Sequence, residues 1–206
     1  MGVREIKTKR QREAILRSAV AVFSQKGFHK ASVEEIARKA SVGKGTIYIY
    51  FDNKSDLFGS AVTEGMEMFI EKLGNELVSD LPFPEHFKKL VAASVSYYIN
   101  YGDLSKIFNN ELSNGIDIKT RLKIEEARSM CLNFFAEILA DGHKRGYIRK
   151  INFQLAAVGL VGLLDSMCNY QLKNKREVDE EQIFDTVYTL LAAGLVEENR
   201  RPRNKN

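Results

Sequence analysis

The chain has 206 residues and a formal net charge of +4, with 44% hydrophobic and 28% charged residues. This length allows one sizeable hydrophobic core and a small appended domain. Three prolines, no tryptophan and few alternating β-branched runs favour an all-helical fold. The longest apolar run, residues 155–164, is shorter than the roughly 20 residues that cross a bilayer, so we expect no membrane partner.

The cysteines and histidines exclude several site chemistries. Cys131 and Cys168 lie in apolar stretches without a C-x-x-C pair, so we expect buried, reduced thiols in a cytoplasmic protein. No metal-ligand spacing relates His29, His86 and His143, and the chain has no G-x-S-x-G motif. We therefore predict no catalytic residue, no metal site and no cofactor.

Positive charge is concentrated at the start of the chain. Residues 1–56 carry 12 Lys+Arg and 6 Asp+Glu, a net charge of +6, which leaves −2 for residues 57–206. This asymmetry is expected of a surface that meets DNA phosphates. Five basic residues precede the first predicted helix: Arg4, Lys7, Lys9, Arg10 and Arg12. They form either a flexible arm that contacts phosphates or the minor groove, or a solvated tail with no role, and we weigh the two equally.

Residues 32–51 have the pattern of two helices joined by a short turn. Ser32, followed by Glu35 three positions later, is a capping box that starts a helix at the next residue. The run ASVGKG interrupts the apolar spacing with small residues, and Ile47 and Phe51 then resume it one turn apart. The segment therefore predicts a helix-turn-helix whose second helix enters the major groove while Ile47 and Phe51 face the core.

The second of these helices supplies candidate DNA contacts within about two turns. We interpret Lys44 and Tyr48 as contacts beside Gly45, which lets the backbone approach a phosphate, and Thr46 and Tyr50 as facing the bases. A phosphate-binding loop in SVGKGT is excluded, because Gly45 follows Lys44 where that loop has serine or threonine.

This segment resembles the DNA-binding domain of the tetracycline-repressor (TetR) family. The positions that match its helix-turn-helix pattern are Ile36, Ala37, Ala40, Val42, Gly45, Ile47, Tyr48, Tyr50, Phe51, Lys54, Asp56 and Leu57. The family's preceding-helix pattern is matched by Ala19, Phe23, Gly27 and Phe28, and the apolar stripe of that helix is Ile15, Ala19, Val22 and Phe23. Ser41 stands where the family usually has glycine, at a turn position that favours positive φ.

The resemblance implies phosphate contacts from Lys44, Tyr48 and Lys54, and a palindromic double-stranded DNA operator as partner. The candidate DNA-binding residues are Ser32, Lys44, Gly45, Thr46, Tyr48, Tyr50 and Lys54. A homodimer is also what the chemistry of DNA recognition requires, because one short helix reads few bases and twofold symmetry doubles the contact.

Helices are predicted through the rest of the chain. Asn53 is a predicted N-cap with Asp56 at the third helical position, and it starts a long helix that ends near residue 77. Further helices are predicted at residues 84–101, 103–112, 117–143, 152–173 and 179–197. With three earlier helices this gives about nine, the number in the TetR family. We predict a three-helix DNA-binding domain at residues 1–52 and a larger helical ligand-binding and dimerisation domain at residues 53–206.

Aromatic and sulfur-containing side chains are frequent in the second domain. Such residues at helical spacing are more often ordinary core than pocket, and only the family resemblance implies an inducer pocket. Its candidates are Met66, Phe69, Tyr97, Tyr101, Phe108, Met130, Phe134, Asp165 and Met167. Asp165 lies in an otherwise apolar helix and needs a partner, which is a ligand, a tyrosine or the other subunit. We expect a small, apolar ligand, elongated or aromatic.

Small and apolar residues recur on the last two predicted helices. Both core packing and an interface use such residues, and the resemblance implies that these helices form the four-helix bundle of a dimer. The interface candidates are Gly159, Gly162, Leu190, Leu191 and Gly194.

We therefore predict a homodimeric, cytoplasmic transcriptional repressor of a bacterium or archaeon, which a small ligand releases from its operator. One alternative is a TetR-like protein with an architectural or protein-partner role and no inducer, which a collapsed cavity would favour. Another is a ligand-binding or catalytic helical protein with a vestigial DNA domain, against which the intact Lys44, Tyr48 and Lys54 argue.

Overall fold

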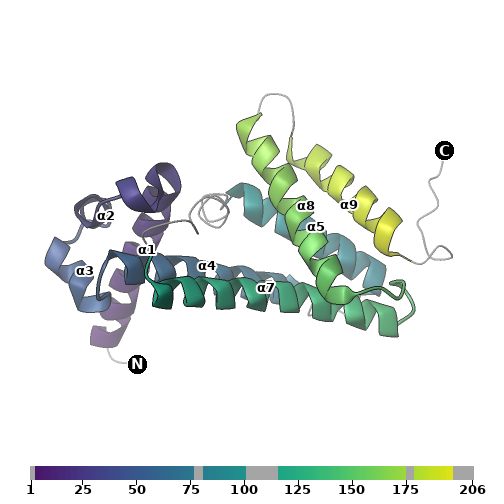
Figure 1. The fold of residues 1–206 in the computed structure, drawn as a ribbon, viewed down its shortest axis with the longest axis horizontal. Coiled ribbons are helices and arrows are strands. Elements are labelled where there is room, and N and C mark those ends of the chain that lie inside the picture. The colour runs from purple at the N-terminus through teal and green to yellow at the C-terminus, as the bar shows by residue number, and fades with distance from the viewer. Residues whose placement is uncertain (1–2, 77–80, 101–115, 175–178, 197–206) are drawn as a thin grey trace. The chain divides into compact units, whose positions relative to one another are not determined.

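The computed structural model describes residues 3–76, 81–100, 116–174 and 179–196, which form eight α-helices (Figure 1). In chain order these are α1 (Val3–Lys30), α2 (Val33–Lys39), α3 (Lys44–Tyr50), α4 (Lys54–Glu76), α5 (Phe83–Asn100), α7 (Ile118–Lys144), α8 (Phe153–Lys173) and α9 (Glu180–Leu195). The predicted all-α class is confirmed. The helix predicted at residues 103–112 lies outside the described residues.

The chain divides into two compact units. Unit 1 comprises residues 1–67 and 103–127, and unit 2 comprises residues 68–102 and 128–206. Helices α4 and α7 each begin in unit 1 and end in unit 2. The division at residue 52 stays a prediction of where the DNA-binding domain ends. In the part of the chain that the structure describes, no helix has the length and apolar character needed to cross a membrane.

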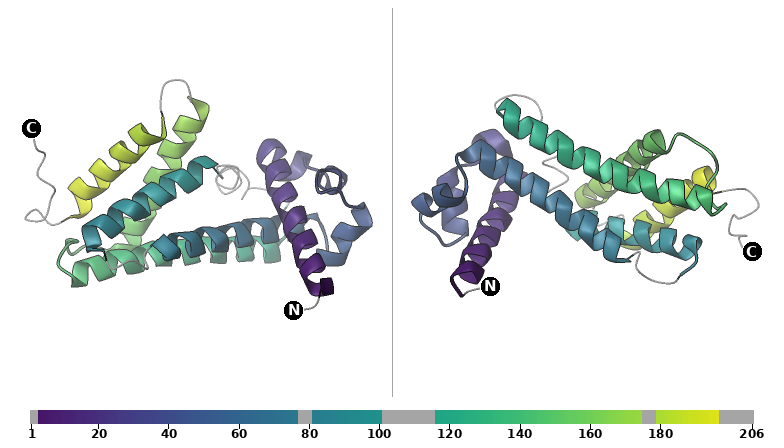
Figure 2. Two further views of the ribbon diagram at one scale, coloured as in Figure 1. Left: turned by 180° about the vertical axis from the view of Figure 1, so that it is seen from behind. Right: turned by 90° about the horizontal axis from the view of Figure 1, so that it is seen from below.

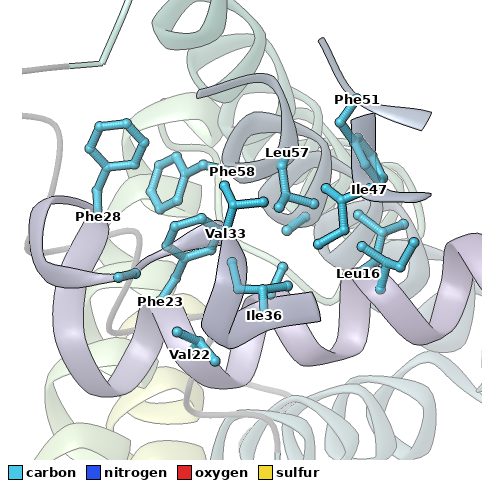
Figure 3. Packing of buried hydrophobic residues seen from close by; sticks show 14 of the residues in the cluster. Leu16, Val22, Phe23, Phe28, Val33, Ile36, Ile47, Phe51, Leu57 and Phe58 are labelled. Atoms are coloured by element: carbon cyan, nitrogen blue, oxygen red, sulfur yellow. The ribbon is translucent and has the colours of Figure 1, made fainter. Parts of the chain in front are cut away.

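Three aromatic rings pack together in the core of unit 1 (Figure 3). The ring centroid of Phe58 lies 4.9 Å from that of Phe23 and 5.2 Å from that of Phe28, both in edge-to-face contact. Apolar residues of α1, α2, α3 and α4 surround them. The stripe predicted on α1 is buried: Ile15, Ala19, Val22 and Phe23. This shared core fixes the two short helices against α1 and α4.

Helices α4 and α7 pack closely where both begin in unit 1. The predicted N-cap is confirmed, because the Asp56 N–H donates to Oδ1 of Asn53 at 2.9 Å. A Cβ atom on Gly59 would lie 2.8 Å from Cγ2 of Thr120, so glycine permits this approach. The Lys123 ammonium lies 3.1 Å from Oδ1 of Asp56 and links the same two helices. The beginning of α4 is thus held by both packing and charge.

The three helices α5, α8 and α9 pack against one another in unit 2 (Figures 1 and 2). Helix α9 starts at a capping box in which Asp179 and Gln182 each accept a backbone N–H of the other. Cys131 and Cys168 are free and buried, as the sequence predicted. Burial raises the pKa of each thiol to about 12. Both therefore behave as packing residues with protonated thiols.

The basic residues near the N-terminus require a correction. Helix α1 begins at Val3, so Lys7, Lys9, Arg10 and Arg12 belong to a helix and do not form a flexible arm. The segment contains no glycine or proline that would delay the helix, and α1 departs from helical geometry only at Gly27, where φ is 74°. The positive charge therefore lies on a structured surface.

Candidate nucleic-acid interface

The first helix of the helix-turn-helix starts at Ser32. Its hydroxyl accepts the Glu35 N–H at 3.2 Å, with φ of −117° and ψ of 147°, so the predicted N-cap is confirmed. The Glu35 carboxylate contacts the ammonium of Lys26, at 2.7 Å. Ser32 therefore stabilises α2 through its side chain, and its predicted contact with DNA stays a prediction.

The turn between α2 and α3 contains Ser41 in the left-handed conformation, with φ of 56°. The Ser41 N–H donates to the Arg38 carbonyl at 3.2 Å, and the Val42 N–H donates to the Ala37 carbonyl at 2.9 Å. These two bonds form the Schellman motif that commonly ends a helix, with serine where glycine is usual. The expectation of positive φ at this position is confirmed, and the motif sets the direction in which α3 leaves.

Helix α3 has one buried and one exposed side. Ile47 and Phe51 are 1% and 2% exposed and belong to the unit 1 core, as predicted (Figure 3). On the other side Tyr48 is 46% exposed and Ile49 is 77% exposed. Ile49 was not among the predicted site residues, although its position two residues after the buried Ile47 places it off the apolar face. The exposed side is the one available to a DNA groove.

The Lys44 ammonium forms an ion pair with the exposed carboxylate of Glu34 on α2. The hydrogen bond between them raises the pKa of Lys44 and lowers that of Glu34. Glu34 was not among the predicted site residues, because this pairing depends on how the turn folds. A phosphate that binds Lys44 must share it with Glu34 or displace the carboxylate.

Two predicted DNA contacts have partners within unit 1. The Tyr50 hydroxyl donates to Oε1 of Gln11 at 2.9 Å, and its ring is half-buried. The Lys54 ammonium donates to the His29 carbonyl at 3.2 Å and lies 4.6 Å from the ring centroid of Phe28. These contacts attach α1 to the end of α3 and to the start of α4.

The other predicted DNA contacts of α3 differ in exposure. Lys44, Gly45 and Tyr48 are exposed, whereas Thr46 is half-buried.

Some of the predicted ligand residues come together in unit 2. The rings of Phe69 and Tyr97 have centroids 4.6 Å apart, and Phe69 is 3% exposed. Phe134 and Met167 are half-buried, whereas Met130 is 37% exposed. Met66 belongs to unit 1, and Tyr101 and Phe108 lie outside the described residues.

Asp165 is half-buried, and its Oδ1 accepts a hydrogen bond from Nδ2 of Asn169 at 3.1 Å. Asn169, one turn later on the same helix, thus supplies one polar partner, and contact of Asp165 with a ligand, a tyrosine or the other subunit stays a prediction. Tyr98, which was not among the site residues, lies near this acid. Burial raises the pKa of Tyr98, and the negative charge of Asp165 adds to the rise.

The predicted interface residues differ in exposure. Gly159, Gly162 and Gly194 are exposed, and a Cβ atom on any of them would meet nothing within 4 Å. Leu190 is 50% exposed, whereas the adjacent Leu191 is only 7% exposed and packs inside its own unit. The exposed apolar residues of α8 that were missed include Leu155 and Val158, at 68% and 49%. They share the helical spacing of the two α8 glycines.

A helix-turn-helix with a basic and aromatic second helix, joined to a larger helical unit, defines a DNA-binding regulator. Comparisons with known proteins agree. A family model for bacterial regulatory proteins of the tetR family matches residues 15–61, and one for the C-terminal region of YsiA-like proteins matches residues 62–194.

Similar proteins are known across most of this length. A fatty acid metabolism regulator protein of Bacillus subtilis is 29% identical over 88% of this chain and 93% of its own. The HTH-type transcriptional repressor NicS of Pseudomonas putida is 30% identical over 72% of this chain and 70% of its own. The crystal structure of FadR from Bacillus subtilis in complex with stearoyl-CoA has a TM-score of 0.76 and 28% identity, and covers 88% of this chain and 98% of that one.

The chain therefore belongs to the TetR family of DNA-binding transcriptional regulators. The resemblance found in residues 32–57 is confirmed and extends through both units. Regulators of this family are not enzymes, and they act as dimers on palindromic operators.

Proposed function

We propose that this chain is a repressor that a long-chain acyl-CoA releases from its operator. The observation that carries the proposal is the similarity to the FadR structure that holds stearoyl-CoA, because it covers both units and 98% of that chain. The relative named a fatty acid metabolism regulator protein, at 29% identity, supports a link to fatty acids. An acyl chain also fits one form of the predicted ligand, which was apolar and either elongated or aromatic.

Unit 2 contains side chains suited to such a molecule. Phe69 and Tyr97 supply apolar ring surface, and Tyr98, whose ring centroid lies 5.9 Å from that of Phe69, supplies a hydroxyl beside it. Asp165, on α8 of the same unit, supplies a carboxylate. We propose that the acyl chain contacts the rings and that a hydroxyl or carboxylate binds a polar part of the ligand.

The remaining roles follow from the exposed surfaces. We propose that Lys44, Gly45 and Tyr48 meet the operator, with Lys44 on a phosphate, and that the exposed faces of α8 and α9 associate in the dimer. We propose that Tyr50 and Lys54 contact DNA at the edge of this surface, while their other contacts hold α1. We place the protein in the cytoplasm, where it meets the chromosome of a bacterium or archaeon.

Binding of the ligand must favour the dimer that does not bind DNA. A hundredfold loss of operator affinity requires about 2.7 kcal/mol of coupling between the two sites. Linkage makes the effect reciprocal, so saturating operator DNA must weaken ligand binding by the same factor. Without such a difference in affinity between the two states, a bound ligand releases nothing.

The proposal is tested by titrating the protein on its operator with stearoyl-CoA, with stearate and coenzyme A as separate controls. We expect stearoyl-CoA to release the DNA, and operator DNA to weaken stearoyl-CoA binding in the reverse titration. Binding of stearoyl-CoA that is indifferent to operator DNA would show that it is not the inducer. A response to no small molecule would instead favour the alternative of an architectural or protein-partnered regulator.

A further inference from the structure

Ile49 on α3 is 77% exposed, the highest fraction among the exposed large apolar side chains of the described residues. Single exposed apolar residues are common on protein surfaces, so its position decides its meaning. It lies on the second helix of the helix-turn-helix, next to the exposed Tyr48 and on the side away from the buried Ile47. Ile49 is therefore positioned to contact the partner that α3 binds.

The geometry of α3 leaves this side chain unscreened. Helical side chains lean toward the N-terminus, so Ile49 lies over the turn that contains Gly45. Gly45 carries no side chain, and a Cβ atom there would meet nothing within 4 Å. A partner can therefore approach the backbone of this turn closely. As a β-branched residue in a helix, isoleucine is also largely held in one χ1 rotamer.

Chemistry limits what Ile49 can recognise in DNA. The base edges in the major groove present hydrogen-bond donors and acceptors, and the thymine C5-methyl group is the apolar feature among them. An aliphatic side chain placed against a polar edge would desolvate that edge without a hydrogen bond. Contact with a methyl group has no such cost and buries apolar surface on both sides.

We propose that Ile49 is a specificity-determining residue that packs on the C5-methyl group of a thymine, one in each operator half-site. The proposal rests on α3 being the recognition helix of the proposed function. Ile49 was not among the predicted DNA-binding residues, and thymine is the base that we propose it recognises. The operator must then contain thymine at one corresponding position of both half-sites.

The test uses the operator that the full-length parent protein selects from random duplex DNA. Each thymine is replaced by deoxyuridine, first in one half-site and then at the matching position of both, which removes the methyl group and keeps the base pair. At about 0.8 kcal/mol for one buried methyl group, replacing the thymine that Ile49 contacts should weaken binding about fourfold in one half-site and about fourteenfold in both. In the Ile49→Ala variant the same replacement should have no effect.

Ile118→Ala is the matched control, because Ile118 is an isoleucine of unit 1 that is 68% exposed on α7. This variant should retain the full sensitivity of the parent to deoxyuridine. Alanine suits an exposed helical position, so Ile49→Ala should keep the parent's circular dichroism spectrum.

The proposal is overturned if every deoxyuridine operator binds the parent as tightly as thymine does, or if Ile49→Ala retains the parent's sensitivity. A selected half-site without thymine on either strand also overturns it. If the parent selects no DNA sequence, the proposed function fails as well. If the parent binds a specific sequence but deoxyuridine has no effect, only the role of Ile49 is overturned, and the proposed function stands.

Discussion

Arg12 of α1 and Glu64 of α4 form a bidentate ion pair, with both nitrogen-to-oxygen distances at 2.6 Å. The Arg12 guanidinium carbon also lies 5.2 Å from the ring centroid of Phe51, the residue that ends α3. The hydrogen bonds to Glu64 raise the pKa of Arg12. One side chain thus connects the first helix, the recognition helix and the helix that leaves unit 1.

We expect Glu64→Gln to destabilise the protein by about 1 kcal/mol, because it removes the charge and one strong acceptor but keeps the side-chain shape. This magnitude is modest because both side chains are about a third exposed. Urea denaturation measures the change. The control is Arg145→Gln, which breaks the exposed pair with Asp141 one turn away and should cost less than about 0.5 kcal/mol. Equal losses in the two variants would contradict a structural role for Arg12.

Glu34 should restrain binding of DNA by Lys44. Removing the carboxylate in Glu34→Gln frees the ammonium and removes a charge that repels phosphates, so affinity for all sequences should rise a few-fold. Lys44→Ala should weaken binding to all sequences and reduce the slope of log affinity against log salt by about one. Fluorescence anisotropy over a salt series measures both. Weaker binding by Glu34→Gln would show that the ion pair instead orders the interface.

Gly45→Ala should separate folding from DNA binding. The added methyl group meets nothing in the protein, and alanine favours a helix by up to about 1 kcal/mol, so stability should stay equal or rise. Operator affinity should fall, because the methyl group stands where α3 approaches DNA. Gly74→Ala on α4 is the matched control, since its Cβ is also unobstructed. Unaltered operator affinity in Gly45→Ala would contradict the placement of this surface.

Local pattern was sufficient for much of unit 1. Ser32 and Asn53 have the residue types and spacing of N-caps, and Ile47 and Phe51 lie one turn apart on the buried face. The positive φ of Ser41 was expected because the family pattern has glycine there. These features depend on neighbours a few residues away, which the sequence contains directly.

Features that depend on tertiary contacts were missed. Arg12 was placed before the first helix, in a flexible arm or a solvated tail, because its partner, Glu64, is 52 residues away. Leu190 and Leu191 are adjacent and chemically identical, so only packing distinguishes the exposed one from the buried one. The candidate ligand residues had no motif of their own, and aromatic spacing alone does not distinguish a core from a pocket.

The dimer prediction is best tested at Leu190 and Gly162. Leu190→Asp and Gly162→Arg place a charge on exposed positions of α9 and α8, so each should give folded monomers that lose operator binding. Light scattering at micromolar concentration measures the mass. Leu122→Asp, at a leucine 58% exposed on α7, should remain dimeric. A monomeric parent, or a dimeric Leu190→Asp, would contradict this interface.

The central claim is that the exposed face of α3 binds the operator, and Tyr48→Ala tests it most directly. Tyr48 is 46% exposed, so its removal should leave the fold and the dimer intact. We predict that operator affinity, measured by anisotropy at fixed salt, falls at least about tenfold, which corresponds to about 1.4 kcal/mol. Leu122→Ala, an exposed substitution elsewhere in unit 1, should bind like the parent. A folded, dimeric Tyr48→Ala protein with the parent's operator affinity would contradict the account.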